Sequence, residues 1–106
     1  MAVVVERIGP RIFRLIGELD SSNVGDVDAV LEEEIPGVGD LTLDLSELTF
    51  VDSMGIGMFA TAADTLEGRG TLILLSPDQS VRRVLELAQL HARPNVEIVY
   101  ADSAMG

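Results

Sequence analysis

Short apolar runs alternate along the chain with longer stretches in which apolar residues recur at helical spacing. Five runs rich in Val, Ile and Leu predict β-strands at Ala2–Glu6, Arg11–Ile16, Leu41–Leu45, Thr71–Leu75 and Val96–Tyr100. A Gly-Pro pair between the first two runs is typical of a turn, so these two runs predict a hairpin.

Three stretches between the later runs predict helices. Asp20–Asn23 supplies candidate N-caps for the first helix, and Pro36-Gly37 ends it. Ser76-Pro77-Asp78-Gln79 predicts the start of the third, with Ser76 as the N-cap and Pro77 in the first helical position. The apolar faces of the three helices consist of Val24, Val27, Val30, Leu31 and Ile35, of Ile56, Phe59, Ala63 and Leu66, and of Val81, Val84, Leu85 and Ala88.

The resulting element order, ββαβαβαβ, predicts a single α/β domain over residues 1–106. Because helices that connect parallel strands make right-handed crossovers, we expect a mixed, mostly parallel sheet with its helices mainly on one face. The first hairpin supplies the antiparallel pair. Residues from about 102 to 106 are typical of a loose C-terminal tail.

Composition excludes several classes of function. The 106 residues include 18 acids and 7 bases, and the net charge of −11 is unfavourable for binding phosphate backbones or anionic membranes. We therefore expect no direct contact with nucleic acid or membrane. With no Cys there is no disulfide or thiolate metal site, and neither a metal nor a cofactor is predicted. The apolar runs are too short for a signal peptide or a membrane span, which favours a soluble, cytoplasmic protein.

The stretch Phe50-Val-Asp-Ser-Met-Gly-Ile-Gly57 places an isolated Asp-Ser pair between an apolar run and the second predicted helix. Ser53 can be the N-cap of that helix, where its hydroxyl would accept a backbone N–H and contribute about 1 kcal/mol. Capping leaves Gly55 and Gly57 unexplained, because each lowers helix propensity by roughly 1 kcal/mol relative to Ala. The two glycines indicate a close backbone approach at this turn.

Two catalytic or nucleotide-binding interpretations of this stretch fit poorly. Gly55-Ile-Gly-Met-Phe-Ala60 matches G-x-G-x-x-A, but a dinucleotide fingerprint follows the first strand and needs an acid at the end of the next one. A nucleophilic serine at position 53 needs a G-x-S-x-G turn, and Val51 stands in place of the first Gly. His91 is the only histidine that could serve as its base. We therefore expect that the chain is not an enzyme.

A third interpretation is that another protein modifies Ser53. The N-terminus of a helix favours negative charge, so a phosphate on Ser53 can be held there without unfolding the domain. It would still add about −1.5 to −2 charges to an exposed surface, which is enough to break a contact with a partner. This interpretation uses the serine, its position and the small residues around it.

Three segments together resemble a STAS domain of the anti-anti-sigma factor type. Gly17-Glu-Leu-Asp20 resembles the family's G-E-L-D turn, and Leu43–Ile56, which contains Asp52-Ser53-Met54-Gly55, resembles its strand-to-helix segment ending in D-S-S-G-L. Gly70–Pro77, with the apolar residues of the third helix, resembles the following strand and last long helix. The three segments occur in the family's order, and the resemblance covers nearly the whole chain.

The resemblance implies an anti-sigma factor antagonist whose phosphorylatable serine is Ser53. Its partner would be a cytoplasmic anti-sigma factor that is itself a serine kinase using ATP. The unmodified domain would bind this kinase and free a sigma factor; phosphorylation would end the binding, and a serine phosphatase would restore it. The residues implied to contact the partner are Asp20, Asp52, Met54, Gly55 and Met58.

Some alternatives stay open from the sequence. Asp20 can cap the first helix, or it can lie beside Ser53 at the strand ends and help present it. Met54 stands where many family members have a second Ser, and with Met58 it forms a second stripe that can be core or partner surface. The same fold without the switch would be a subunit of a larger assembly, such as a lipid-transport or stress-sensing complex. A homodimer also stays open.

Overall fold

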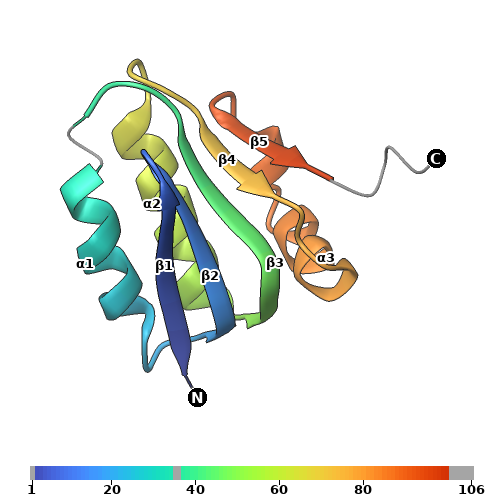
Figure 1. Cartoon of the computed structure of the whole chain (residues 1–106). Coiled ribbons are helices and arrows are strands. Elements are labelled where there is room, and N and C mark those ends of the chain that lie inside the picture. The colour runs from blue at the N-terminus through green and yellow to red at the C-terminus, as the bar shows by residue number, and fades with distance from the viewer. Residues whose placement is uncertain (1, 35–36, 101–106) are drawn as a thin grey trace.

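The computed structural model describes residues 2–34 and 37–100, which form five strands and three helices (Figure 1). Ile35 and Pro36, predicted at the end of the first helix, and the predicted tail from about residue 102 lie outside the described residues. The strands are β1 (Val3–Gly9), β2 (Ile12–Leu19), β3 (Leu41–Val51), β4 (Leu72–Leu75) and β5 (Val96–Val99). The helices are α1 (Val24–Glu34), α2 (Ser53–Leu66) and α3 (Gln79–Leu87), and a 3-10 turn follows at Leu90–Ala92. The predicted order ββαβαβαβ is confirmed.

The sheet is mixed and mostly parallel, as predicted. Its strands lie in sequence order, with β1 and β2 antiparallel and each later strand parallel to its predecessor. The register aligns Phe13 of β2 with Leu43 of β3, and Leu43 with Leu74 of β4, so these three side chains share one face. The opposite face carries the neighbouring pair Arg14 and Asp44.

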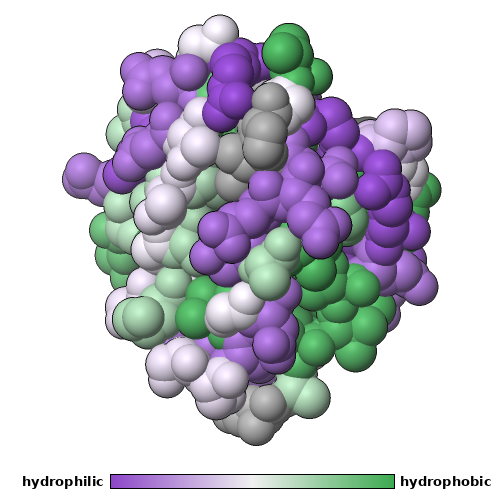
Figure 2. All heavy atoms as spheres, turned by 90° about the vertical axis from the view of Figure 1, so that its left-hand side faces the viewer, coloured by the Kyte–Doolittle hydropathy of each residue, from purple (hydrophilic) through white to green (hydrophobic). Residues whose placement is uncertain are grey.

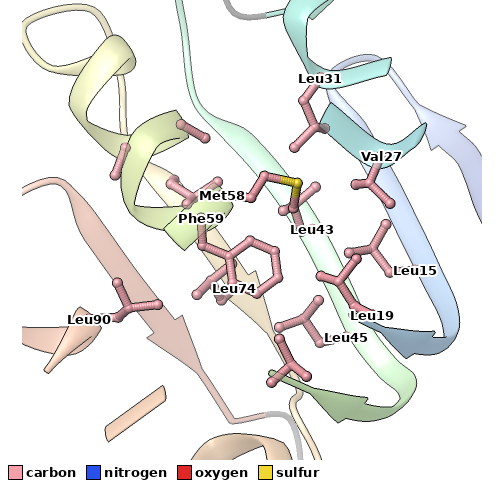
Figure 3. Close-up of a cluster of buried hydrophobic side chains, with 14 of the residues drawn as sticks. Leu15, Leu19, Val27, Leu31, Leu43, Leu45, Met58, Phe59, Leu74 and Leu90 are labelled. Atoms are coloured by element: carbon pink, nitrogen blue, oxygen red, sulfur yellow. The ribbon is translucent and has the colours of Figure 1, made fainter. Parts of the chain in front are cut away.

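The helices cover the apolar face of the sheet, because each crossover returns to the next strand in the same direction. α2 lies behind β1 and β2 in Figure 1, with α1 beside it. In the core, Phe59 and Met58 of α2 lie among the apolar side chains of the strands, with Val27 and Leu31 of α1 nearby (Figure 3). All four are buried.

The limits of several elements differ from the prediction. β3 runs to Val51 rather than Leu45, because bulges let it accommodate polar residues and still pair with β2. Ser76 is not a cap: it has φ +55° and its N–H donates to Val99 O in β5. Asp78 caps α3 instead, accepting from Val81 N at 2.8 Å. Ala88, predicted on the buried face of α3, is the exposed C-cap.

Candidate functional site

Asp52 is the N-cap of α2, so the interpretation of Ser53 as the cap, one of those open from the sequence, is wrong. Its backbone is extended, and its carboxylate Oδ1 accepts from Met54 N at 2.9 Å and from Gly55 N at 3.2 Å. The Asp52 carbonyl also accepts from Ile56 N. Both Asp and Ser are good caps, so local sequence alone does not separate them. Asp52 caps the helix because it is the first residue after β3, and Ser53 is the first residue of the helix.

The same carboxylate joins α2 to the turn that follows β2. Asp52 Oδ2 accepts from Ser21 N at 3.2 Å, and Asp52 N donates to Leu19 O at 3.1 Å. The ends of the parallel strands β2 and β3 thus bring the turn after Leu19 and the start of α2 to one edge of the sheet. Asp20, Asp52 and Ser53, which are far apart in the sequence, lie in two segments that Asp52 connects directly.

Asp20 organises its own turn rather than capping α1 with its side chain. Its carboxylate accepts from Ser22 N at 2.9 Å and from the Ser22 hydroxyl. The Ser22 hydroxyl, followed by the Ser22 backbone N–H, lowers the pKa of Asp20 below its ordinary value. Asp20 therefore stays charged at neutral pH in the turn next to Asp52.

Asn23 is a structural part of the site that the sequence offered only as one of several candidate caps. Its side chain is buried, accepts from Asp20 N at 3.0 Å and donates to Glu18 O at 2.8 Å. A buried amide that satisfies two backbone groups fixes the course of the turn. Its position immediately before the first helix was the available signal.

Ser53 is exposed at the start of the helix that carries Phe59, as predicted. Its hydroxyl makes no hydrogen bond to any described residue, while the next N–H groups of the helix are already bound to Asp52. Two of the exposed large apolar side chains flank it in the sequence, Phe50 at 44% and Met54 at 53%. The hydroxyl is therefore accessible and uncommitted.

The two glycines after Ser53 have different roles. Gly55 is buried, and a Cβ built on it would lie 2.6 Å from Val51 Cγ2 and 2.9 Å from Leu19 Cδ2. It lets α2 approach β2 and β3 closely, which confirms the close approach predicted at this position. Gly57 is exposed, and a Cβ there would have no described atom within 4 Å. Among the described residues no close approach requires Gly57, so the close approach expected at both glycines is found only at Gly55.

A groove of about 330 Å³ separates the start of α2 from α1, with Ser53 at its wall. Met54 and Met58 both line it, but Met54 is half exposed while Met58 is 6% exposed and packs in the core (Figure 3). The other lining residues are Val24, Gly25 and Asp28 of α1, and Gly57 and Thr61 of α2. Of the five residues implied to contact a partner, Asp20, Asp52 and Met54 are thus accessible, Met58 forms part of the groove wall, and Gly55 lies beneath the surface.

The surface around the groove is acidic. Figure 2 faces the side of the molecule that α1 occupies and shows hydrophilic side chains interspersed with apolar patches. α1 carries Asp26, Asp28 and Glu32 to Glu34, and Asp20 and Asp52 lie just before the two helices. No group of three or more metal-ligating side chains occurs within residues 2–34 and 37–100. None of the helices in this part of the chain has the length and apolar character needed to cross a membrane.

The STAS domain model matches residues 1–102. The chain belongs to the STAS domain family. This family is one of regulatory binding modules rather than enzymes, in agreement with the sequence prediction. His91, the only candidate base for a nucleophilic Ser53, lies exposed in the 3-10 turn after α3.

Solved structures described as anti-sigma factor antagonists resemble this chain over nearly its whole length. The anti-sigma factor antagonist SpoIIAA in its unphosphorylated form is 25% identical, with a TM-score of 0.66, over 98% of this chain and 94% of that one. The Bacillus cell fate determinant SpoIIAA in the phosphorylated form is 26% identical with the same TM-score, over 98% and 96% of the two chains. An anti-sigma factor antagonist from Mycobacterium paratuberculosis has a TM-score of 0.76 over 98% and 90%, but its 20% identity shows the shared fold alone.

Proposed function

We propose that this STAS domain is an anti-sigma factor antagonist that is switched by phosphorylation of Ser53. The observation that carries the proposal is the exposed Ser53 hydroxyl, which has no hydrogen bond to any described residue, at the start of α2 beside an apolar groove. The unmodified domain would bind a cytoplasmic anti-sigma factor and release a sigma factor. The similarity to SpoIIAA, which is known in an unphosphorylated and a phosphorylated form, supports this function.

The partner would be a serine kinase that transfers the γ-phosphoryl group of ATP to the Ser53 hydroxyl, and a serine phosphatase would remove it. ATP would belong to the kinase. Asp20, Asp52 and Met54 would contact the partner directly, Met58 would line the groove, and Gly55 would hold α2 in place beneath them. Such a cycle would take place in the cytoplasm.

Phosphorylation would act on the interface rather than on the fold. Asp52 already binds the N–H groups of Met54 and Gly55, so the phosphate would find these donors occupied. It would instead project beside the carboxylates of Asp20 and Asp52 and at the wall of the groove. Two added negative charges on an acidic surface, facing a partner that packs against it, carry a large desolvation and repulsion penalty. Weakening a nanomolar complex to micromolar requires about 4 kcal/mol.

The test uses the purified domain and each anti-sigma serine kinase encoded in its genome, with wild type, Ser53→Ala and Ser53→Asp compared for affinity and for phosphate uptake from labelled ATP. We expect one kinase to bind wild type and Ser53→Ala tightly, to phosphorylate only wild type, and to bind Ser53→Asp much more weakly. Ser53→Asp should melt within a few degrees of wild type, because Asp is well tolerated in the first turn of a helix. Phosphate uptake by Ser53→Ala, or no uptake by wild type from any of the kinases, would refute the switch.

The runner-up function is a non-switching subunit of a larger assembly, such as a lipid-transport or stress-sensing complex. It is favoured by the face of the sheet that the helices leave open, where Val4 and Ile8 of β1 are 55% and 42% exposed. A larger assembly would cover this face. Co-purification of the untagged domain in a stable complex, together with a Ser53 that no kinase modifies, would favour this function over the switch.

A further inference from the structure

The groove between α1 and α2 has open space at two glycines that line it. Gly25 of α1 and Gly57 of α2 are both exposed, and a Cβ built on either would have no described atom within 4 Å. A glycine inside a helix, such as Gly57, costs about 1 kcal/mol relative to Ala. Packing among the described residues does not offset this cost, because no neighbour requires the missing Cβ. The space beside the two glycines is therefore available to another molecule.

The groove follows the axis of α2 on the side where α1 lies (Figure 1). Ser53, Gly57 and Thr61 line it at intervals of four residues, so it extends over about 12 Å of the helix. Val24 and Met58 give it apolar surface that is continuous with the core. An apolar groove that runs along a helix is typical of surfaces that bind an amphipathic helix.

Asp28 is the only ionisable side chain among the described residues that line the groove. It is partly buried, and its carboxylate makes no hydrogen bond or ion pair with any described residue. The carboxylates of Asp20 and Asp52, at the Ser53 end, already accept hydrogen bonds from their own turns. Arg69, which follows α2 at its other end, donates to the carbonyl of Thr65 and does not line the groove. Asp28 thus leaves a negative charge in the groove that a basic side chain of a partner would neutralise.

We propose that the groove binds an amphipathic helix of the anti-sigma kinase that carries an aliphatic side chain and, one helical turn away, a Lys or Arg. The aliphatic side chain would lie between Gly25 and Gly57, and the base would pair with Asp28. This inference rests on the proposed function, since it names the chemistry by which the kinase recognises the domain beside Ser53. Glu32, exposed one turn further along α1, would favour a basic partner as well. A second copy of this chain, with its net charge of −11, would instead bring like charges together.

Two variants that replace an acid of α1 by a base test the ion pair. Asp28→Lys changes the groove, whereas Glu33→Lys changes an exposed residue that does not line it. The binding partner is the kinase that phosphorylates wild type. We expect Asp28→Lys to weaken binding by about 30-fold and Asp28→Asn by about tenfold, while Glu33→Lys stays within about threefold. Because both Lys variants change the net charge equally, the difference between them reports the local contact.

Gly57→Leu tests the open space, because its side chain would occupy the groove. Leu is a good helix former, so this variant should melt at or above the temperature of wild type. We expect it to bind the kinase about 30-fold more weakly. Gln79→Leu is the matched control, since Gln79 is an exposed residue at the start of α3 that does not line the groove, and its affinity should stay within about twofold of wild type. Weaker binding by a domain of equal or higher stability cannot result from a loss of fold.

Equal losses of affinity in Asp28→Lys and Glu33→Lys, tighter binding of Asp28→Lys, or unchanged affinity of Gly57→Leu would each overturn the inference. The proposed function would survive any of these results, provided that the kinase still phosphorylates Ser53. If the melting curve showed Gly57→Leu to be unfolded, the two Lys variants would decide the inference alone. If no kinase binds or phosphorylates the wild-type domain, the proposed function fails first, and the inference falls with it.

Discussion

Asp52→Ala should destabilise the domain by about 2 kcal/mol, whereas Ser53→Ala should change its stability by less than about 0.5 kcal/mol. Asp52 caps α2 through two hydrogen bonds, at 2.9 and 3.2 Å, and a cap of this kind contributes about 1 kcal/mol. Its second oxygen holds Ser21 N at 3.2 Å, and a hydrogen bond adds about 1 kcal/mol. The Ser53 hydroxyl makes no hydrogen bond within the described residues, so its removal breaks none.

The assay is thermal and urea unfolding of wild type and the two variants, monitored by circular dichroism. A loss of 2 kcal/mol should lower the melting temperature by roughly 8–16 °C in a domain of this size. Asp52→Asn should lie in between, because its amide oxygen still caps the helix, while its NH₂ group cannot accept from Ser21 N. If Ser53→Ala lost as much stability as Asp52→Ala, the serine would be the cap and the argument for its free hydroxyl would fail.

The remaining predictions concern packing and acid stability. Gly55→Ala should lower the free energy of unfolding by about 1–3 kcal/mol, because its Cβ would meet side chains of β3 and β2 at 2.6 and 2.9 Å. Gly57→Ala should leave the free energy of unfolding unchanged or raise it by up to about 1 kcal/mol. Equal melting temperatures of the two variants would contradict the close packing at Gly55. Burial alone would raise the pKa of Asp44, but its hydrogen bonds with Ser46 and Arg14 outweigh burial and keep the pKa below the ordinary 3.8. The Asp44 carboxylate binds fewer protons in the folded than in the unfolded state, so the free energy of unfolding should fall as the pH drops below 3.8. In urea unfolding measured at several acidic pH values, Asp44→Asn should show a shallower fall than wild type. An equally steep fall in the variant would refute this role of Asp44.

The order of the elements and the character of the sheet could be predicted from the sequence. Periods of two and of about 3.6 residues are local properties, and alternating strands and helices leave few topologies once crossovers are right-handed. The approach of α2 to the sheet at Gly55 was also visible, since a glycine in the first turn of a helix needs a reason. The exposed Ser53 followed from its place between a strand and a helix.

Other features were decided only by contacts between distant segments. Asp52 and Ser53 are equally good caps in isolation, and the position of β3 beside β2 placed the Asp52 carboxylate within reach of Ser21 N. Ser76 looked like a cap, but its N–H bonds to β5, so the helix begins later, after Asp78.

The length of β3 and the burial of the two methionines of α2 were also decided by contacts between distant segments. β3 was predicted to end at Leu45, because its later residues do not alternate; bulges against β2 carry it on to Val51, beyond the last residue that pairs with β4. Met54 and Met58 lie on one stripe of α2, yet packing against the core buries only Met58. Sequence periodicity reports which residues share a face of an element, whereas the neighbours that cover part of that face come from elsewhere in the chain, and only the tertiary structure brings them there.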